Sequence, residues 1–93
     1  MKVNHVEGRK AGEVLLYALS TCIWCRRVKK LLDDLGVAYS YIDVDLLEKD
    51  HHDRASEMIR EWNPACSFPT LVIDNENCIV GYDEEKIREA LGP

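Results

Sequence analysis

Residues 20–27 read Ser-Thr-Cys-Ile-Trp-Cys-Arg-Arg and place a Cys-x-x-Cys pair between a strand-like run and a helix-like run. Upstream, residues 14–19 form a nearly continuous apolar run, which is typical of a central strand buried on both faces. Downstream, apolar side chains recur at helical spacing from Trp24 to Leu35, with charged residues between them. The sequence therefore predicts a strand, a helix over 23–35, and two cysteines at the first turn of that helix.

A cysteine pair at the start of a helix suits redox chemistry. Free backbone N–H groups and the positive end of the helix dipole favour an anion there. The first cysteine of such a pair can have its pKa lowered from about 8.5 into the range of roughly 3.5–7.5. We therefore expect Cys22 to be the nucleophile and Cys25, about one helical turn later, to be the resolving thiol. Cys-x-x-Cys is also half of a zinc site, but the flanking strand and helix favour the redox interpretation.

Size and composition fit one small domain spanning residues 1–93. The chain has 93 residues, of which 46% are hydrophobic and 31% charged, so we expect one modest core. No apolar run approaches the length of a membrane span and no signal peptide is evident, which together predict a cytoplasmic protein. The net charge of −5 disfavours nucleic acid and anionic membranes as partners. A monomer is expected.

The rest of the chain predicts more strands and helices in a regular order. Residues 1–12 are polar and without a clear period, so we expect a flexible N-terminal extension, in which Val3 and Val6 could begin a short extra strand. The other expected elements are a strand over 37–44, a helix from Asp45 to about Glu61 that opens with an Asp45/Glu48 capping box, strands over 68–73 and 78–80 joined by a turn at 74–77, and a helix over 84–91 capped by Asp83. The first strand, helix and strand form a βαβ unit with parallel strands.

Two further clusters of reactive side chains need an interpretation. His51, His52 and Asp53 look like metal ligands, but adjacent helix residues point in different directions, so a solvated helix face is favoured and no metal site is predicted. Cys78 should lie opposite about Ile73 in the hairpin. Cys66 then falls several residues away, too far for a disulfide with Cys78. We expect Cys78 to be a small buried hydrophobe, while Cys66, before the strand over 68–73, could be a third redox thiol.

The order βαβ, helix, β-hairpin, helix, with Cys-x-x-Cys at the first helix, resembles the thioredoxin-like fold, and the small size resembles its glutaredoxin branch. The resemblance covers roughly residues 13–91. Its motifs are Thr21-Cys22-Ile23-Trp24-Cys25, Phe68-Pro69-Thr70 and Gly81-Tyr82-Asp83-Glu84. It implies an α/β fold of the βαβ-α-ββ-α type, with a four-stranded mixed sheet and helices on both faces.

The resemblance also implies substrate-binding positions. The first motif supplies the two thiols, with Thr21 and Trp24 beside them; Trp24 could instead pack in the core. The second motif implies a cis-proline at Phe68-Pro69 whose backbone meets the substrate. The third implies that Gly81, with Asp83 or Glu84, meets the far end of glutathione.

Three positions depart from typical glutaredoxins. Ile23-Trp24 stands between the cysteines where Pro-Tyr is usual, Leu19 stands where a lysine usually meets a glutathione carboxylate, and Val80-Gly81 replaces a double glycine. Glutathione is therefore one possible reductant and a separate reductase is another.

These observations predict a dithiol thiol–disulfide oxidoreductase that takes electrons from glutathione or a reductase, reduces protein or small-molecule disulfides, and needs no other cofactor. One alternative is an electron carrier reduced by a flavin or iron–sulfur reductase and serving a single protein client. Another is a zinc or iron–sulfur module, although a second close Cys or His pair is missing. A third is a thioredoxin-like interaction domain without catalysis.

Overall fold

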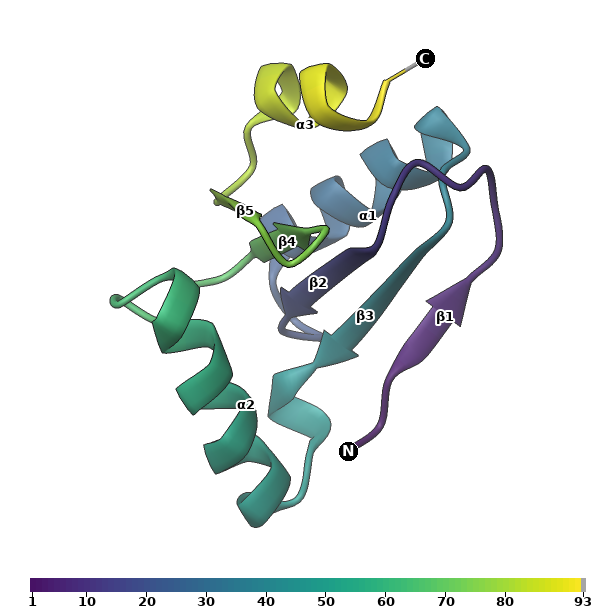
Figure 1. The fold of residues 1–93 in the computed structure, drawn as a ribbon. Coiled ribbons are helices and arrows are strands. Elements are labelled where there is room, and N and C mark those ends of the chain that lie inside the picture. Colours follow the sequence, from purple (N-terminus) through teal and green to yellow (C-terminus); the bar gives the residue numbers. More distant parts are fainter. Residues whose placement is uncertain (93) are drawn as a thin grey trace.

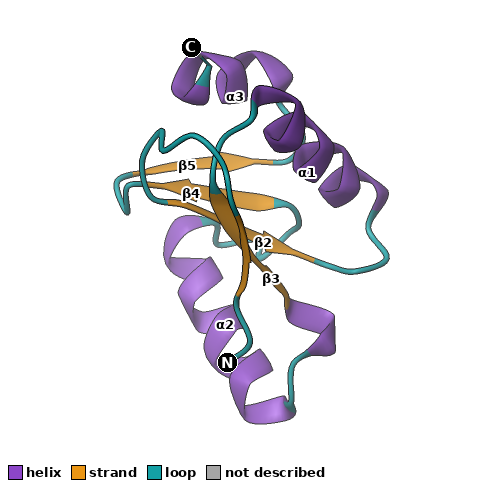
Figure 2. Ribbon diagram, turned by 90° about the vertical axis from the view of Figure 1, so that its right-hand side faces the viewer, coloured by secondary structure: helices purple, strands orange, loops and turns teal. Residues whose placement is uncertain are grey.

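The structure, a computed structural model, describes residues 1–92 and contains a mixed sheet between two helical layers (Figure 1). Helices α1 and α3 cover one face of the sheet and α2 covers the other, as the two views together show (Figure 2). The elements are β1 (Asn4–Val6), β2 (Val14–Ala18), α1 (Ile23–Leu35), β3 (Tyr39–Asp43), a 3₁₀ turn η1 (Val44–Leu46), α2 (Lys49–Trp62), β4 (Thr70–Ile73), β5 (Asn77–Val80) and α3 (Glu84–Leu91).

The strand order is β1-β3-β2-β4-β5, with β2 and β3 parallel and all other neighbours antiparallel. The predicted α/β fold and its parallel βαβ unit are therefore confirmed. The expected count of four strands is wrong, because β1 lies along β3 and adds a fifth. After β1, Arg9 makes a separate, parallel bridge to Val37, with hydrogen bonds from the Arg9 N–H to the Gly36 carbonyl and from the Ala38 N–H to the Arg9 carbonyl. A strand of three residues is too short to show a period, which explains why the sequence pattern indicated a flexible extension instead.

Strand β2 lies in the middle of the sheet and is buried on both sides. Leu16 and Ala18 face the layer of α1 and α3, whereas Tyr17 faces α2; all three are at most 2% exposed. Burying one leucine-sized side chain contributes about 1.5–3 kcal/mol. The continuous apolar run predicted this double burial, and it makes β2 a rigid support for the loop that follows it.

The end of α1 is set by a local residue preference, whereas the start of α2 is set by a contact with a distant residue. Helix α1 ends as predicted at Gly36, whose φ of 69° is the left-handed conformation that glycine adopts most easily. The predicted capping box at Asp45 is wrong: Asp45 lies in η1, and α2 starts later, with Glu48 at its N-cap and no side-chain capping bond. The Asp45 carboxylate accepts two hydrogen bonds from Ser20 instead, so it is not available to cap α2.

The β4–β5 hairpin has a three-residue loop, with Asp74 and Asn75 in the left-handed region. Cys78 pairs with Val72, one residue from the expected position. The strand β4 begins at Thr70 rather than at residue 68, after the proline. Cys78 is half-buried rather than fully buried, and burial raises the pKa of its thiol. All four cysteines are free thiols.

Candidate active site

The two cysteines of the Cys-x-x-Cys motif lie at the start of α1, as predicted. Cys22 is the N-cap residue, in extended conformation, and its Sγ accepts a hydrogen bond from the backbone N–H of Cys25 at 3.2 Å. The Cys22 carbonyl accepts the N–H of Arg26, and the Cys22 N–H donates to the carbonyl of Leu19. The sulfur of Cys22 therefore takes the place of a capping oxygen at the positive end of the helix.

The two thiols differ sharply in exposure. Cys22 is partly exposed, whereas Cys25 is 0% exposed and belongs to the core beneath α1. The pKa of Cys25 is raised to about 12, first because burial penalises the thiolate, and then because of a side-chain hydrogen bond with Cys22 and the charge of Cys22. A backbone hydrogen bond with Leu19 and the charge of Lys29 lower it. Only the first sulfur is thus open to an incoming disulfide.

The loop that leads into the dithiol is bound to η1, the 3₁₀ turn that follows β3. The Ser20 backbone N–H and hydroxyl donate to the two carboxylate oxygens of Asp45, at 2.8 and 2.5 Å. These hydrogen bonds lower the pKa of Asp45. No local signal in the sequence links these two residues, because Ser20 lies in the loop after β2 and Asp45 lies in η1.

The segment before β4 carries the predicted proline site. The Phe68-Pro69 peptide bond is cis, as the resemblance implied, and Pro69 is buried. The Asn63 side-chain amide donates to Ser67 and to the Thr70 hydroxyl, which holds the loop before the proline in place. Asn63 was interpreted from the sequence only as the end of a helix.

A cavity of about 230 Å³ joins several of the predicted positions. The Gly81 N–H donates to the Pro69 carbonyl at 2.8 Å, which brings the β5–α3 loop against the proline. Across the cavity, Trp24 is 52% exposed and stacks on Tyr82, with ring centroids 6.0 Å apart and an interplanar angle of 26°. The lining residues are Trp24, Phe68, Pro69, Gly81 and Tyr82. The exposure of Trp24 excludes the alternative that this side chain packs in the core. Tyr82, which belongs to the Gly81-Tyr82-Asp83-Glu84 motif but has no role predicted from the sequence, also lines the cavity.

Comparison with protein families matches residues 14–79 to the glutaredoxin family. The chain belongs to this family. Glutaredoxins are thiol–disulfide oxidoreductases, and the chain is therefore an enzyme of that class. The matched range begins with β2 and includes the dithiol, the cis-proline and most of the β-hairpin.

Solved structures of other glutaredoxins superimpose closely on this chain. It is 49% identical to the glutaredoxin from Methanosarcina mazei Go1, with a TM-score of 0.91, covering 100% of this chain and 90% of that one. It is 48% identical to methanoredoxin from Methanosarcina acetivorans, with a TM-score of 0.89 and coverage of 92% and 90%. A buckwheat glutaredoxin–glutathione complex is 28% identical, with a TM-score of 0.66 and coverage of 86% and 70%.

Four predicted site residues of this glutaredoxin lie outside the cavity lining: Cys22, Cys25, Thr21 and Asp83. Thr21 is exposed and directly precedes Cys22. Asp83 is the N-cap of α3, and its carboxylate accepts the N–H of Lys86 at 3.1 Å, as the predicted cap requires. Cys66 is not brought to the dithiol either: it packs against the α2 side of the sheet, whereas Cys22 packs against the α1 side.

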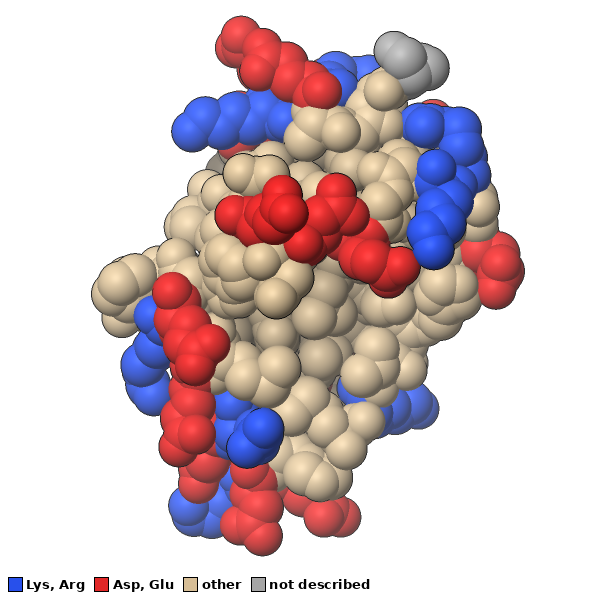
Figure 3. Space-filling model, in the orientation of Figure 1, with Lys and Arg blue, Asp and Glu red and all other residues tan. Residues whose placement is uncertain are grey.

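The predicted solvated face of α2 is observed. His51, His52 and Asp53 are exposed, and Asp53 pairs with Lys49 at 2.8 Å. Figure 3 shows acidic and basic side chains interleaved along this helix. Among residues 1–92, no three His, Cys, Asp or Glu side chains lie together in a way that could hold a metal ion. None of the helices in the same range is long and apolar enough to cross a membrane.

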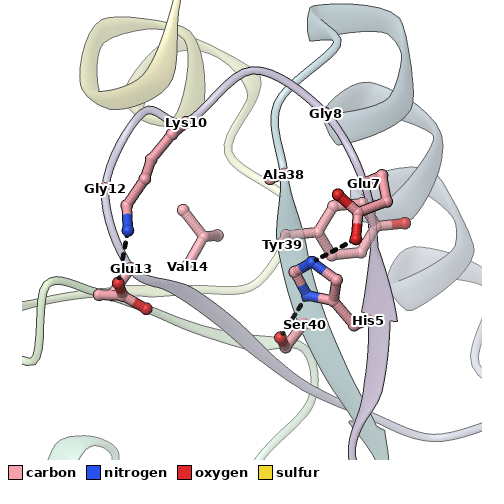
Figure 4. Close-up of a pocket in the computed structure, with 10 residues that line it drawn as sticks. All are labelled: His5, Glu7, Gly8, Lys10, Gly12, Glu13, Val14, Ala38, Tyr39 and Ser40. Carbon is pink, nitrogen blue, oxygen red and sulfur yellow. Dashed lines mark hydrogen bonds and ion pairs between the residues drawn. The ribbon is translucent and has the colours of Figure 1, made fainter.

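A second cavity, of about 320 Å³, lies at the loop between β1 and β2 (Figure 4). Its polar side chains already bind one another: His5 contacts Glu7 and Ser40, and Lys10 contacts Glu13. The floor is Val14, Ala38 and Tyr39. Strand β1, the loop after it and the start of β3 supply most of this lining, whereas the dithiol lies at the start of α1.

Proposed function

We propose that the chain reduces disulfides by a dithiol mechanism in which Cys22 is the nucleophile and Cys25 the resolving thiol. The observation that carries this proposal is the contrast between the two sulfurs. Cys22 is partly exposed and its sulfur accepts an N–H at the helix start, whereas Cys25 is completely buried. A thiol with a pKa of about 12 stays protonated at neutral pH, so Cys25 does not attack until the first exchange has changed the charge on Cys22 beside it.

The reaction consists of two thiol–disulfide exchanges. In the first, the Cys22 thiolate attacks one sulfur of the substrate disulfide; a bond from Cys22 to that sulfur forms, the substrate S–S bond breaks, and the leaving thiolate takes up a proton. In the second, Cys25 loses its proton and attacks the sulfur of Cys22, which releases the other half of the substrate as a thiol. The substrate has gained two electrons and two protons, and an internal Cys22–Cys25 disulfide remains for a reductant to open.

We infer that the substrate lies in the cavity between Trp24 and Pro69. Its apolar and aromatic walls fit the chain on either side of a cysteine, and the backbone before the cis-proline faces the same space. The backbone of Gly81 forms the part of the cavity wall beside Pro69 and is a further contact for the substrate. Contacts of the substrate with Thr21 and Asp83 remain predictions. A disulfide in a protein is the favoured substrate class.

We also infer a reductase, rather than glutathione, as the reductant. Leu19 packs partly buried against the core on the α2 side, so this position brings no cation to the dithiol. The buckwheat relative was solved with glutathione, which makes glutathione the comparison to test. We expect glutathione to reduce the internal disulfide much more slowly than a flavin-dependent dithiol reductase does. Equal rates would contradict this inference. A cytoplasmic location, where thiols stay reduced, suits four free cysteines.

Trapping of the mixed disulfide tests the dithiol mechanism. With a small neutral disulfide, Cys25→Ser should accumulate one adduct on Cys22, and Cys22→Ser should form none and lose activity. Cys66→Ser and Cys78→Ala are matched controls that should keep the activity of the wild type. An adduct on Cys25 or Cys66 in the wild type, or full activity of Cys22→Ser, would exclude the proposed roles.

A further inference from the structure

One ion pair beneath the dithiol differs from the others. Lys29 Nζ lies 3.1 Å from Asp43 Oδ1, and the two side chains are only 22% and 15% exposed. Among residues 1–92, no other ion pair has both side chains so deeply buried. The same ammonium lies 4.1 Å from the centre of the Tyr41 ring. A partly desolvated cation is thus held in one place by a carboxylate and an aromatic face.

This pair lies next to the resolving thiol. Lys29 is four residues after Cys25 on α1, so the two side chains share one helix face, with Cβ atoms about 5–6 Å apart. Asp43 pairs in register with Ala18, the last residue of β2 before the dithiol loop. Helix α1 follows the loop after the end of β2 (Figure 1). The ammonium therefore lies between the Cys25 face of α1 and the end of β3.

We propose that Lys29 is a positioning residue for the second exchange, in which Cys25 attacks the mixed disulfide on Cys22. This rests on the proposed function. The Lys29 ammonium stabilises the developing Cys25 thiolate, and Asp43 holds the ammonium in position. Lys29 touches neither substrate nor the reacting bond; it acts through Cys25.

The charges around Cys25 explain why the effect falls on the second exchange. Before substrate binds, the hydrogen bond and the charge of Cys22 raise the pKa of Cys25, and the charge of Lys29 lowers it. Once Cys22 carries the substrate it has no charge, so its contribution disappears while that of Lys29 stays. The second exchange thus begins with a cation beside Cys25 and no opposing thiolate.

Other ionisable groups around the ammonium come from β3 and η1. Asp43 and Tyr41 contact it directly, and Asp45 is close enough for its pKa to be lowered slightly by Lys29. The two carboxylates oppose the effect of Lys29 on Cys25. Asp43→Asn removes one of these negative charges but keeps a side-chain oxygen that can accept a hydrogen bond from Lys29, so it should not slow the second exchange. This separates an electrostatic role from a structural one.

The experiment follows both exchanges with bis(hydroxyethyl) disulfide, a neutral probe that does not interact with the charges. The reduced protein is mixed with the probe over a series of pH values and quenched with acid. Intact mass spectrometry then measures the reduced form, the adduct and the internal disulfide. The variants are Lys29→Met, Lys29→Arg and Asp43→Asn, and the matched control is Lys30→Met, one position away on the exposed face.

We expect Lys29→Met to leave the loss of the reduced form unchanged but to accumulate adduct. A tenfold loss of thiolate slows exchange by about threefold, so for a loss of that size the second exchange should slow by about threefold, and its pH profile should move to higher pH. Lys29→Arg should restore the wild-type profile, and Lys30→Met should match it.

Several results would overturn the proposal. These are an unchanged second exchange in Lys29→Met, equal effects of Lys29→Met and Lys30→Met, or an Asp43→Asn variant that is slowed like Lys29→Met. The last result would show a structural role, and Asp43→Asn keeps the test valid if Lys29→Met does not fold. Wild-type protein with its adduct on another cysteine would instead disprove the dithiol mechanism itself.

Discussion

In the reduced native protein, we expect Cys25 to react with iodoacetamide about a hundredfold more slowly than an ordinary cysteine. Its pKa of about 12 leaves a thiolate fraction of about 10⁻⁵ at neutral pH, against about 0.03 for a thiol with the ordinary pKa of about 8.5. The thiolate of Cys25 is therefore roughly 3,000-fold less populated than that of an ordinary cysteine. A thiolate of higher pKa is also more nucleophilic, with a slope of about 0.4–0.5, which offsets about 40-fold of this difference in rate. Complete burial lowers the rate further.

The perturbation that tests this reasoning is Cys22→Ala. It removes the hydrogen bond and the charge that raise the pKa of Cys25, and it leaves the burial of Cys25 in place. The pKa of Cys25 should fall toward its ordinary value, and its alkylation at neutral pH should become at least about threefold faster. Cys66→Ala removes a thiol on the other side of the sheet and is the matched control, in which the rate at Cys25 should not change.

The assay measures initial alkylation rates at each cysteine by mass spectrometry, in reduced and metal-free protein, over a pH series. Only chains with a single modification are counted, because alkylation of Cys22 would itself change the surroundings of Cys25. In denaturant all four cysteines should react at similar rates. If Cys25 in the native wild type reacts as fast as Cys66, or if Cys22→Ala slows it, the assignment of Cys25 as a protected resolving thiol is wrong.

Three further outcomes are expected. The raised pKa of Cys25 contributes stability that is complete below about pH 8.5 and is lost as pH rises toward about 12, by up to about 1.4 kcal/mol per pH unit. In denaturant titrations, the free energy of unfolding of the reduced wild type should therefore fall more steeply at alkaline pH than that of Cys25→Ala. Parallel curves for the two proteins would contradict this. The pKa of Asp45 is lowered mainly by the hydrogen bonds from Ser20, so this contribution is present above about pH 3.9 and is lost as pH falls through the lower folded pKa; Asp45→Asn should flatten the acid limb of the stability profile. Leu16→Ala should cost about 2–5 kcal/mol in the free energy of unfolding, because it opens a cavity in the central strand, whereas Leu46→Ala, at a side chain 70% exposed, should change it by less than about 0.5 kcal/mol.

Local sequence pattern was sufficient for the elements that carry the dithiol. The apolar run of β2 and the helical period after Trp24 are properties of adjacent residues, and Gly36 ends α1 through its own backbone freedom. The same is true of Asp83, whose carboxylate reaches a backbone N–H only three residues away. Where an interaction is complete within one turn or one strand, the chain needs no distant partner to form it.

The predictions failed where a distant partner competes with a local one. Asp45 has the sequence of a helix cap, yet its carboxylate accepts hydrogen bonds from Ser20 and the helix begins later. Strand β1 has too few residues for a pattern and exists because the edge of β3 offers unpaired backbone groups. In both cases the deciding contact joins segments that only the folded sheet brings together.

The sequence by itself determined the dithiol at a helix start, the central buried strand and, through a resemblance, the cis-proline opposite. The tertiary structure alone decided which sulfur is accessible, that Trp24 stacks on Tyr82 beside the cis-proline, and that Lys29, one helical turn after Cys25, pairs with Asp43. The physical reason is that spacing along a chain sets which residues share a helix face or strand face, whereas burial and charge at a site depend on what other elements pack against that face.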